Sequence, residues 1–215
     1  MTYSTREANR YYGIDAWGNG YFGINGRGHL TVHPLRDARR VDIHALLPKL
    51  TKRKLRCPLL LRFPQILQSR LDELFAAFHS AIREFEYDGT YRGVFPIKVN
   101  QNADVVEALV KAGRKRGFGL EAGSKAELAV ALTHQLDDDA IVVCNGYKDA
   151  DYVRLALRAT QLGRKVVIIV EKPQEVELIA RVAKRLKVKP WLGARIRLHS
   201  KSSGKWTGSS GSGSK

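Results

Sequence analysis

Lys98 is the residue of this 215-residue chain whose type and position most suggest chemistry, since it stands near the end of the apolar run 91–101. A lysine amine becomes nucleophilic when a partly dry pocket lowers its pKa, and it can then condense with an aldehyde. The alternative reading is a solvated charge at the point where a strand ends. The elements around Lys98 therefore bear on the choice between these two readings.

Strand-like and helix-like segments alternate from about residue 58 onward. The expected strands are residues 59–63, 93–99, 118–120, 140–144, 165–170 and 191–198. Helices are expected at 66–85, 102–116 and 149–161, and two more from Ser124 and from Pro173, which would be the first residue of its helix. This alternation predicts an α/β fold with a parallel sheet. Six such units fit an open doubly wound sheet or an incomplete (β/α)8 TIM-like barrel, and the chain length favours the barrel, which needs about 250 residues when complete.

In both folds the carboxyl ends of the strands form the mouth where ligands bind, and Lys98 belongs to that mouth. A rigid strand end aims the amine as an enzyme that uses pyridoxal phosphate requires, because such enzymes hold the cofactor as a Schiff base on a lysine. Pro96 removes one hydrogen bond from what should be a central strand, and we interpret it as a β-bulge.

Residues 1–50 have a different pattern, with short strands expected at 21–24 and 29–32 around an Asn25–Gly26 turn. Glycines in residues 18–23 spell GxGxxG, but neither a strand before them nor a helix after them is expected, so a dinucleotide site is disfavoured. His29 and His33 would lie roughly 13 Å apart on an extended chain, which makes them poor candidates for one metal site.

Bulk composition narrows the class of protein. The net charge of +16 is spread evenly, with 16 basic and 9 acidic residues in the first 100 positions and 21 and 12 in the rest, so nucleic-acid binding is disfavoured. Cys57 and Cys144 both lie in apolar runs and are expected to be buried free thiols of a reducing compartment. With no apolar leader and no membrane-length apolar run, a soluble cytoplasmic protein without membrane contact is expected.

Two segments together carry a family resemblance. Phe95-Pro-Ile-Lys-Val-Asn-Gln101 and Gly119-Leu-Glu-Ala-Gly-Ser-Lys-Ala-Glu-Leu128 resemble the second and third barrel strands of the barrel-type, alanine-racemase-like pyridoxal phosphate decarboxylases. The segment 17–28 and the Pro-Ile-Lys-Val-Asn-Gln form of the lysine motif look most like the biosynthetic arginine decarboxylases. The resemblance extends from about Tyr11 to Trp206.

This resemblance implies roles for three residues. Lys98 matches the catalytic lysine that binds the cofactor, Glu121 matches an acidic residue near the cofactor, and Arg195 matches an arginine close to its ring. The competing interpretations are a charge at a helix N-terminus for Glu121 and an ordinary strand-end cation for Arg195. Ser124 is expected only to cap its helix.

The resemblance also implies an activity, namely the decarboxylation of L-arginine to agmatine and carbon dioxide for polyamine synthesis, with pyridoxal 5'-phosphate and Mg2+ as cofactors. Family members continue into further barrel strands and a β-sandwich domain, and the complete protein is expected to be a homo-oligomer. The expected organisation is a β-rich segment of that second domain at 1–50, a partial barrel at 51–199 and a Gly/Ser-rich tail at 200–215. The tail is interpreted as a truncated loop, and an appended linker is the alternative. Such a fragment alone is expected to be inactive, and the alternative function is a non-catalytic relative that binds the cofactor or a partner protein.

Overall fold

The computed structural model describes residues 4–196, which leaves the predicted tail at 200–215 outside the described residues. The chain divides into two compact units, one up to Tyr91 and one from Arg92 onward. The first domain boundary was predicted at residue 50, whereas the structure groups residues 51–91 with the N-terminal unit.

The N-terminal unit consists of α1 (Thr5–Tyr11), α2 (Ile14–Trp17), β1 (Phe22–Ile24), β2 (Leu30–Val32), β3 (Val41–Asp42), α3 (Ile43–Lys52) and α4 (Pro64–Glu84). The two predicted strands are confirmed as the antiparallel pair β1–β2, and β3 extends this sheet. β1, which overlaps the GxGxxG segment at residues 18–23, therefore continues into a hairpin and not into the helix that a dinucleotide site needs. The short helices α1, α2 and α3 were not predicted.

The two histidines of the hairpin have separate partners. His29 Nδ1 lies 2.9 Å from Asp42 Oδ2, and His33 Nε2 lies 2.9 Å from Thr31 Oγ1. The bond with His29 and the bond from the Ala45 amide lower the pKa of Asp42 to about 2. Asp42 therefore stays ionised at neutral pH as the cap of α3, and these contacts stabilise the fold locally.

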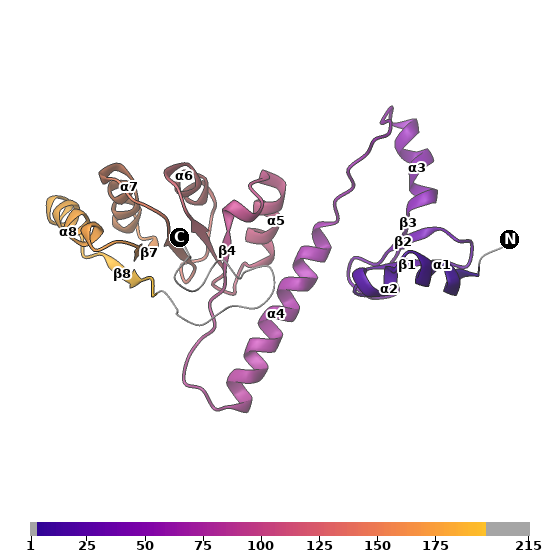
Figure 1. Ribbon diagram of the computed structural model, residues 1–215, viewed down its shortest axis with the longest axis horizontal. Coiled ribbons are helices and arrows are strands. Elements are labelled where there is room, and N and C mark those ends of the chain that lie inside the picture. The colour runs from indigo at the N-terminus through magenta and orange to yellow at the C-terminus, as the bar shows by residue number, and fades with distance from the viewer. Residues whose placement is uncertain (1–3, 197–215) are drawn as a thin grey trace. The chain divides into compact units, whose positions relative to one another are not determined.

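The second unit consists of β4 (Val94–Pro96), the 3-10 helix η1 (Ile97–Val99), α5 (Ala103–Ala112), β5 (Gly119–Ala122), α6 (Lys125–Thr133), β6 (Ile141–Cys144), α7 (Ala150–Gln161), β7 (Lys165–Val170), α8 (Gln174–Leu186) and β8 (Trp191–Ala194). The five strands form one parallel sheet in the order β4-β5-β6-β7-β8. Helices α5–α8 stand in a row along one side of this sheet (Figure 1). The predicted α/β fold with a parallel sheet is thereby confirmed.

Burial alternates along β6 and β7, which distinguishes the two faces of the sheet. Val142, Cys144, Val166 and Ile168 are buried in the apolar core that also contains residues of the four helices, whereas Val143 between them is only half-buried. Side chains of successive strand residues point to opposite faces, so the face opposite the helices is the more accessible one. The mouth of the sheet is formed where these strands end.

Local sequence signals set the helix boundaries. The Ser124 hydroxyl accepts a hydrogen bond of 3.2 Å from the Glu127 amide, and Asp149 accepts one of 2.9 Å from the Tyr152 amide. These side chains satisfy amides that the first helical turn leaves unpaired. The prediction that Ser124 caps its helix is confirmed, and α8 begins one residue after the predicted Pro173.

Three expectations for the strands were wrong. Residues 59–63 form no strand, and the sheet of the described residues starts only at β4. The predicted strand 93–99 ends at Pro96, and Lys98 lies in η1. Pro96 marks no bulge, because the pairing of β4 with β5 continues in even register through Pro96 and Glu121. β4 is an edge strand of the described sheet, where a proline is tolerated.

The two cysteines differ in environment. Cys144 is buried as expected, and this burial raises the pKa of its thiol to about 11, so that it stays protonated and unreactive near neutral pH. Cys57 is exposed, so its predicted burial was wrong, since the segment that contains it packs into no apolar core. Within residues 4–196 none of the helices has the length and apolar character needed to span a membrane.

Candidate cofactor site

The candidate site lies at the carboxyl ends of the parallel strands. Lys98 follows the end of β4 by two residues, Glu121 is the third residue of β5, and Arg195 comes directly after β8. Register places Pro96 opposite Glu121, which brings η1 beside the end of β5. All three residues predicted from the resemblance therefore lie at the carboxyl end of the same parallel sheet, which is called the sheet edge below.

Lys98 and Glu121 lie close together, with 3.6 Å between Nζ and Oε1. The Lys98 side chain is 61% exposed, whereas that of Glu121 is only 7% exposed. Leu120 and Ala122 point into the core under the helices, so Glu121 between them points to the opposite face. The amine thus reaches solvent while its carboxylate partner is fixed in the sheet.

Oε1 of Glu121 is buried and accepts no hydrogen bond from the described part of the chain. A buried carboxylate oxygen without a donor carries a desolvation cost of a few kcal/mol, which a bound donor would offset. The 3.6 Å to Lys98 is too long for a hydrogen bond. A buried oxygen that accepts no hydrogen bond, beside a lysine amine, is what a site for a polar ligand should present.

Glu127 holds the segments on either side of this pair. Its carboxylate accepts hydrogen bonds from the Gln101 side chain at 3.1 Å and from the Gly123 amide at 2.7 Å. Gln101 follows Lys98 along the chain, and Gly123 follows Glu121. The bonds therefore fix both loops that carry the candidate pair.

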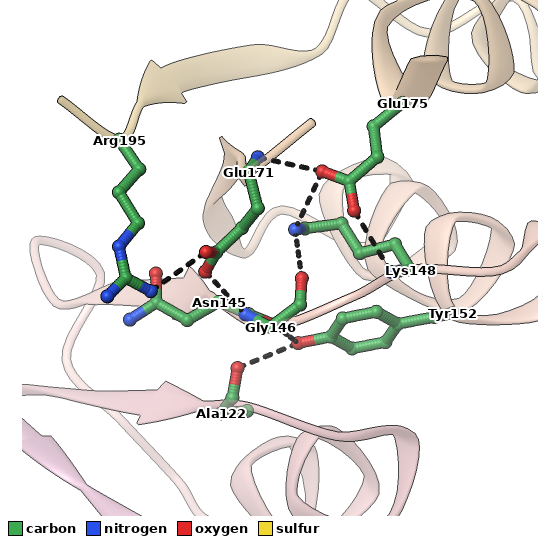
Figure 2. A network of polar contacts seen from close by, with 8 residues as sticks. All are labelled: Ala122, Asn145, Gly146, Lys148, Tyr152, Glu171, Glu175 and Arg195. Atoms are coloured by element: carbon green, nitrogen blue, oxygen red, sulfur yellow. Dashed lines mark hydrogen bonds and ion pairs between the residues drawn. The ribbon is translucent and has the colours of Figure 1, made fainter. Parts of the chain in front are cut away.

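Arg195 is not paired with either of these residues. Its Nη1 donates to Glu171 Oε2 at 2.8 Å, and the other carboxylate oxygen of Glu171 accepts from the Gly146 amide at 2.9 Å (Figure 2). Two strands, β6 and β7, separate β5 from β8. The structure thus forms two clusters at one sheet edge, one around Lys98 and one around Arg195.

Sequence reasoning did not single out Glu171, nor the buried residues Lys148 and Glu175 that support it. Each lies within five residues after the end of β6 or β7, where loops of a parallel sheet meet. A charged residue shortly after an expected strand is therefore the sequence signal from which these three residues could have been predicted. Their pairing joins residues 27 apart in the chain, which local patterns do not encode.

The pKa of Glu171 lies below its ordinary value. Burial opposes ionisation, but the bond from the Gly146 amide, the Arg195 guanidinium and the charge of Lys148 together outweigh it. Since the unfolded pKa is roughly 4.3, the stabilisation is complete above that pH and is lost as pH falls through the lower folded value.

We therefore expect Glu171→Gln to lower the free energy of unfolding by about 1 to 3 kcal/mol at pH 7 and by progressively less below about pH 4.5. Urea unfolding of both proteins between pH 3 and pH 7 measures this difference. A difference that stays constant over this range would contradict the role of the ionised carboxylate.

No magnesium ligand is assigned. Among residues 4–196, no group of three or more His, Cys, Asp or Glu side chains is arranged to hold a metal ion. The magnesium expected from the resemblance therefore has no such ligand group among these residues.

Comparison with known proteins gives a consistent result. A family model described as the pyridoxal binding domain of pyridoxal-dependent decarboxylases matches residues 71–215. The biosynthetic arginine decarboxylase of Parasynechococcus marenigrum is 46% identical over 210 residues, which are 97% of this chain and 33% of that protein. Its counterpart in Bacteroides thetaiotaomicron is 44% identical over 209 residues, with the same coverage of 97% and 33%.

A solved structure matches as well. The crystal structure of the biosynthetic arginine decarboxylase SpeA from Campylobacter jejuni superposes with a TM-score of 0.79 at 35% identity, covering 87% of this chain and 31% of that one. The chain spans about a third of the length of the relatives that it matches.

Proposed function

This chain belongs to the family of pyridoxal-dependent decarboxylases, whose pyridoxal binding domain it matches, and from that premise we propose that Lys98 binds pyridoxal 5'-phosphate for the decarboxylation of L-arginine. The products would be agmatine and carbon dioxide. The substrate rests on the relatives, which are named biosynthetic arginine decarboxylases. The observation that carries the proposal is the placement of the Lys98 amine 3.6 Å from a buried oxygen of Glu121 that accepts no hydrogen bond.

The described residues fit the cofactor. When bound, pyridoxal phosphate supplies an electron sink for the bond that breaks at the substrate α-carbon. Lys98 would hold the cofactor through its aldehyde carbon, because a lysine amine can condense with an aldehyde. Glu121 holds a buried carboxylate 3.6 Å from that amine, and its Oε1 can accept a hydrogen bond from a bound group. Arg195, fixed by Glu171, presents a permanent positive charge at the same sheet edge.

For the fold, we propose that the parallel sheet is part of an incomplete (β/α)8 barrel. We place this partial barrel at residues 51–199, most of which the family model covers with its match to residues 71–215. Residues 1–50 then belong to a second, β-sandwich domain, residues 200–215 form the tail, and the complete protein is a homo-oligomer. Since the chain spans about a third of its relatives, the intact protein is the form in which activity is to be measured.

Reductive labelling tests the site. The intact protein is loaded with pyridoxal phosphate, reduced with borohydride and digested, and the modified lysine is located by peptide mapping. We expect the label on Lys98. Carbon dioxide release from L-arginine by the same preparation tests the activity, and a labelled protein that releases none would instead be a cofactor-binding relative without catalysis.

Lys111 serves as the internal control for this labelling. Its side chain is 62% exposed and lies 2.6 Å from a glutamate, so it matches Lys98 in accessibility and in having an acidic neighbour. Label on Lys111 in proportion to Lys98 would indicate non-specific modification and would remove the site assignment.

A further inference from the structure

A charged pair is fully enclosed at the carboxyl ends of β6 and β7. The side chains of Lys148 and Glu175 are 0% and 6% exposed, and Lys148 Nζ lies 3.3 Å from Glu175 Oε2. Burying two charges costs several kcal/mol per ion before their attraction is counted, and apolar residues of similar size often do as well or better. Stability alone therefore does not explain the presence of this pair.

The hydrogen bonds of the pair are directed at two loops. Glu175 accepts from the Lys148 amide at 3.2 Å and from the Glu171 amide at 2.8 Å, while Lys148 Nζ also donates to the Gly146 carbonyl. Gly146 and Lys148 belong to the β6–α7 loop, and Glu171 begins the β7–α8 loop. The buried pair thus fixes the backbone of both loops where the strands end.

One further link leads to the candidate site. With its backbone held by Glu175, Glu171 accepts from the Gly146 amide through one carboxylate oxygen and from Arg195 through the other. Figure 2 shows this continuous path of contacts from Lys148 and Glu175 to Arg195. The Arg195 side chain at one end of this path is 60% exposed, whereas Lys148 and Glu175 at the other end are buried.

A tyrosine links the β6–α7 loop to the end of β5. The Tyr152 hydroxyl, from α7, lies 2.7 Å from the Ala122 carbonyl and 3.3 Å from the Asn145 carbonyl, and the Asn145 amide donates to Ala122 at 2.8 Å. Ala122 directly follows Glu121. The loop held by the buried pair is therefore also bonded to the end of the strand that carries Glu121.

We propose that Lys148 and Glu175 are positioning residues of the cofactor site, which act through Glu171 to fix the Arg195 guanidinium. This inference rests on the proposed function, because it assigns a role toward the cofactor. Both side chains are buried beneath the loops that they bind, so neither is exposed to a bound cofactor. Their effect is the orientation of a side chain that does.

The test separates positioning from stability by comparing single and double substitutions in the intact protein. Glu175→Gln leaves the buried lysine without its counter-charge, so we expect the unfolding temperature to fall by roughly 10 °C. Combining Lys148→Met with Glu175→Leu removes both charges, so the unfolding temperature should lie above that of Glu175→Gln, although the Lys148 and Glu171 amides lose their acceptor.

The deciding measurement is the dissociation constant of pyridoxal phosphate, obtained by absorbance titration. In the double variant we expect it to rise about tenfold, although this variant is more stable than Glu175→Gln, because the loop bonds that orient Glu171 are gone. Arg195→Ala should raise it as well, and adding Arg195→Ala to the double variant should raise it no further, since both changes act through one side chain.

Two further proteins complete the design. Lys165 at the amino end of β7 is half-buried and pairs with the exposed Asp139, which also neighbours Arg92, so Lys165→Met with Asp139→Asn removes a charged pair far along the strand from the candidate site and should leave the dissociation constant unchanged. Glu171→Gln keeps the buried pair and one acceptor oxygen for the Gly146 amide but removes the carboxylate that binds Arg195, so it should reproduce the tenfold rise and serves if the double variant does not fold.

A double variant, or a Glu171→Gln variant, that binds the cofactor as tightly as wild type would overturn the positioning role. Additive effects of the double variant and Arg195→Ala would overturn it too. A wild-type protein that binds no pyridoxal phosphate at all would instead refute the proposed function, so the two failures are distinguishable.

Discussion

Replacing Lys98 by alanine or by arginine is expected to lower kcat for arginine decarboxylation by the intact protein by roughly three orders of magnitude or more. Alanine removes the amine. Arginine keeps the positive charge beside Glu121 but stays protonated at any accessible pH, so it cannot bond to the aldehyde carbon. The reaction is measured as carbon dioxide released from L-arginine at saturating pyridoxal phosphate.

The arginine variant makes this test specific. If Lys98 served only as the ionic partner of Glu121, Lys98→Arg would keep most of the activity, and the proposed covalent role would be wrong. Lys111→Ala is the matched control, because Lys111 has nearly the same exposure and also neighbours a glutamate, Glu107. We expect this control to retain wild-type kcat.

The parallel sheet could be predicted from sequence because each of its units is locally encoded. Apolar β-branched runs such as residues 165–170 can be stable only when buried between neighbours, and side chains such as Ser124 and Asp149 mark where helices begin. Strand order was not determined in this way, because a doubly wound sheet and a barrel arrange the same units differently, and the described sheet has the sequential order β4-β5-β6-β7-β8.

The errors in the predicted strands have physical causes. Residues 59–63 are apolar enough for a strand, but a strand exists only with a partner, and partner availability is a property of the whole fold. The proline at position 96 lies at the last residue of an edge strand, where its missing amide disrupts no ladder, so the inferred bulge was unnecessary. Lys98 lies past the end of its strand because the chain turns into η1.

The candidate site was predictable only in part. Lys98, Glu121 and Arg195 were proposed from a resemblance, and the structure places all three at one edge of the sheet. Composition and spacing gave no sign that Arg195 pairs with Glu171, or that a lysine at position 148 is buried. Such pairings depend on register between strands, which brings together loops about 25 residues apart.

Register also depends on one glycine of β5. A Cβ built at Gly119 would lie 1.8 Å from the backbone carbonyl oxygen of Ile141, in the neighbouring strand β6. A backbone atom in a sheet cannot move aside as a flexible side chain can, so any side chain here must push the two strands apart. Because β5 and β6 lie inside the sheet, the displacement would reach Glu121 two residues later.

We expect Gly119→Ala to lower the free energy of unfolding by at least about 3 kcal/mol, which corresponds to roughly 6 to 12 °C in unfolding temperature. Gly123→Ala, four residues on, is the control, because its Cβ would meet nothing closer than a Glu127 oxygen at 3.4 Å and its φ is not in the left-handed region. Thermal unfolding followed by circular dichroism compares the two variants. Equal unfolding temperatures would show that β5 and β6 can separate at little cost. The carboxyl end of the sheet would then be too flexible to hold Lys98 and Glu121 in the geometry on which the proposed chemistry depends.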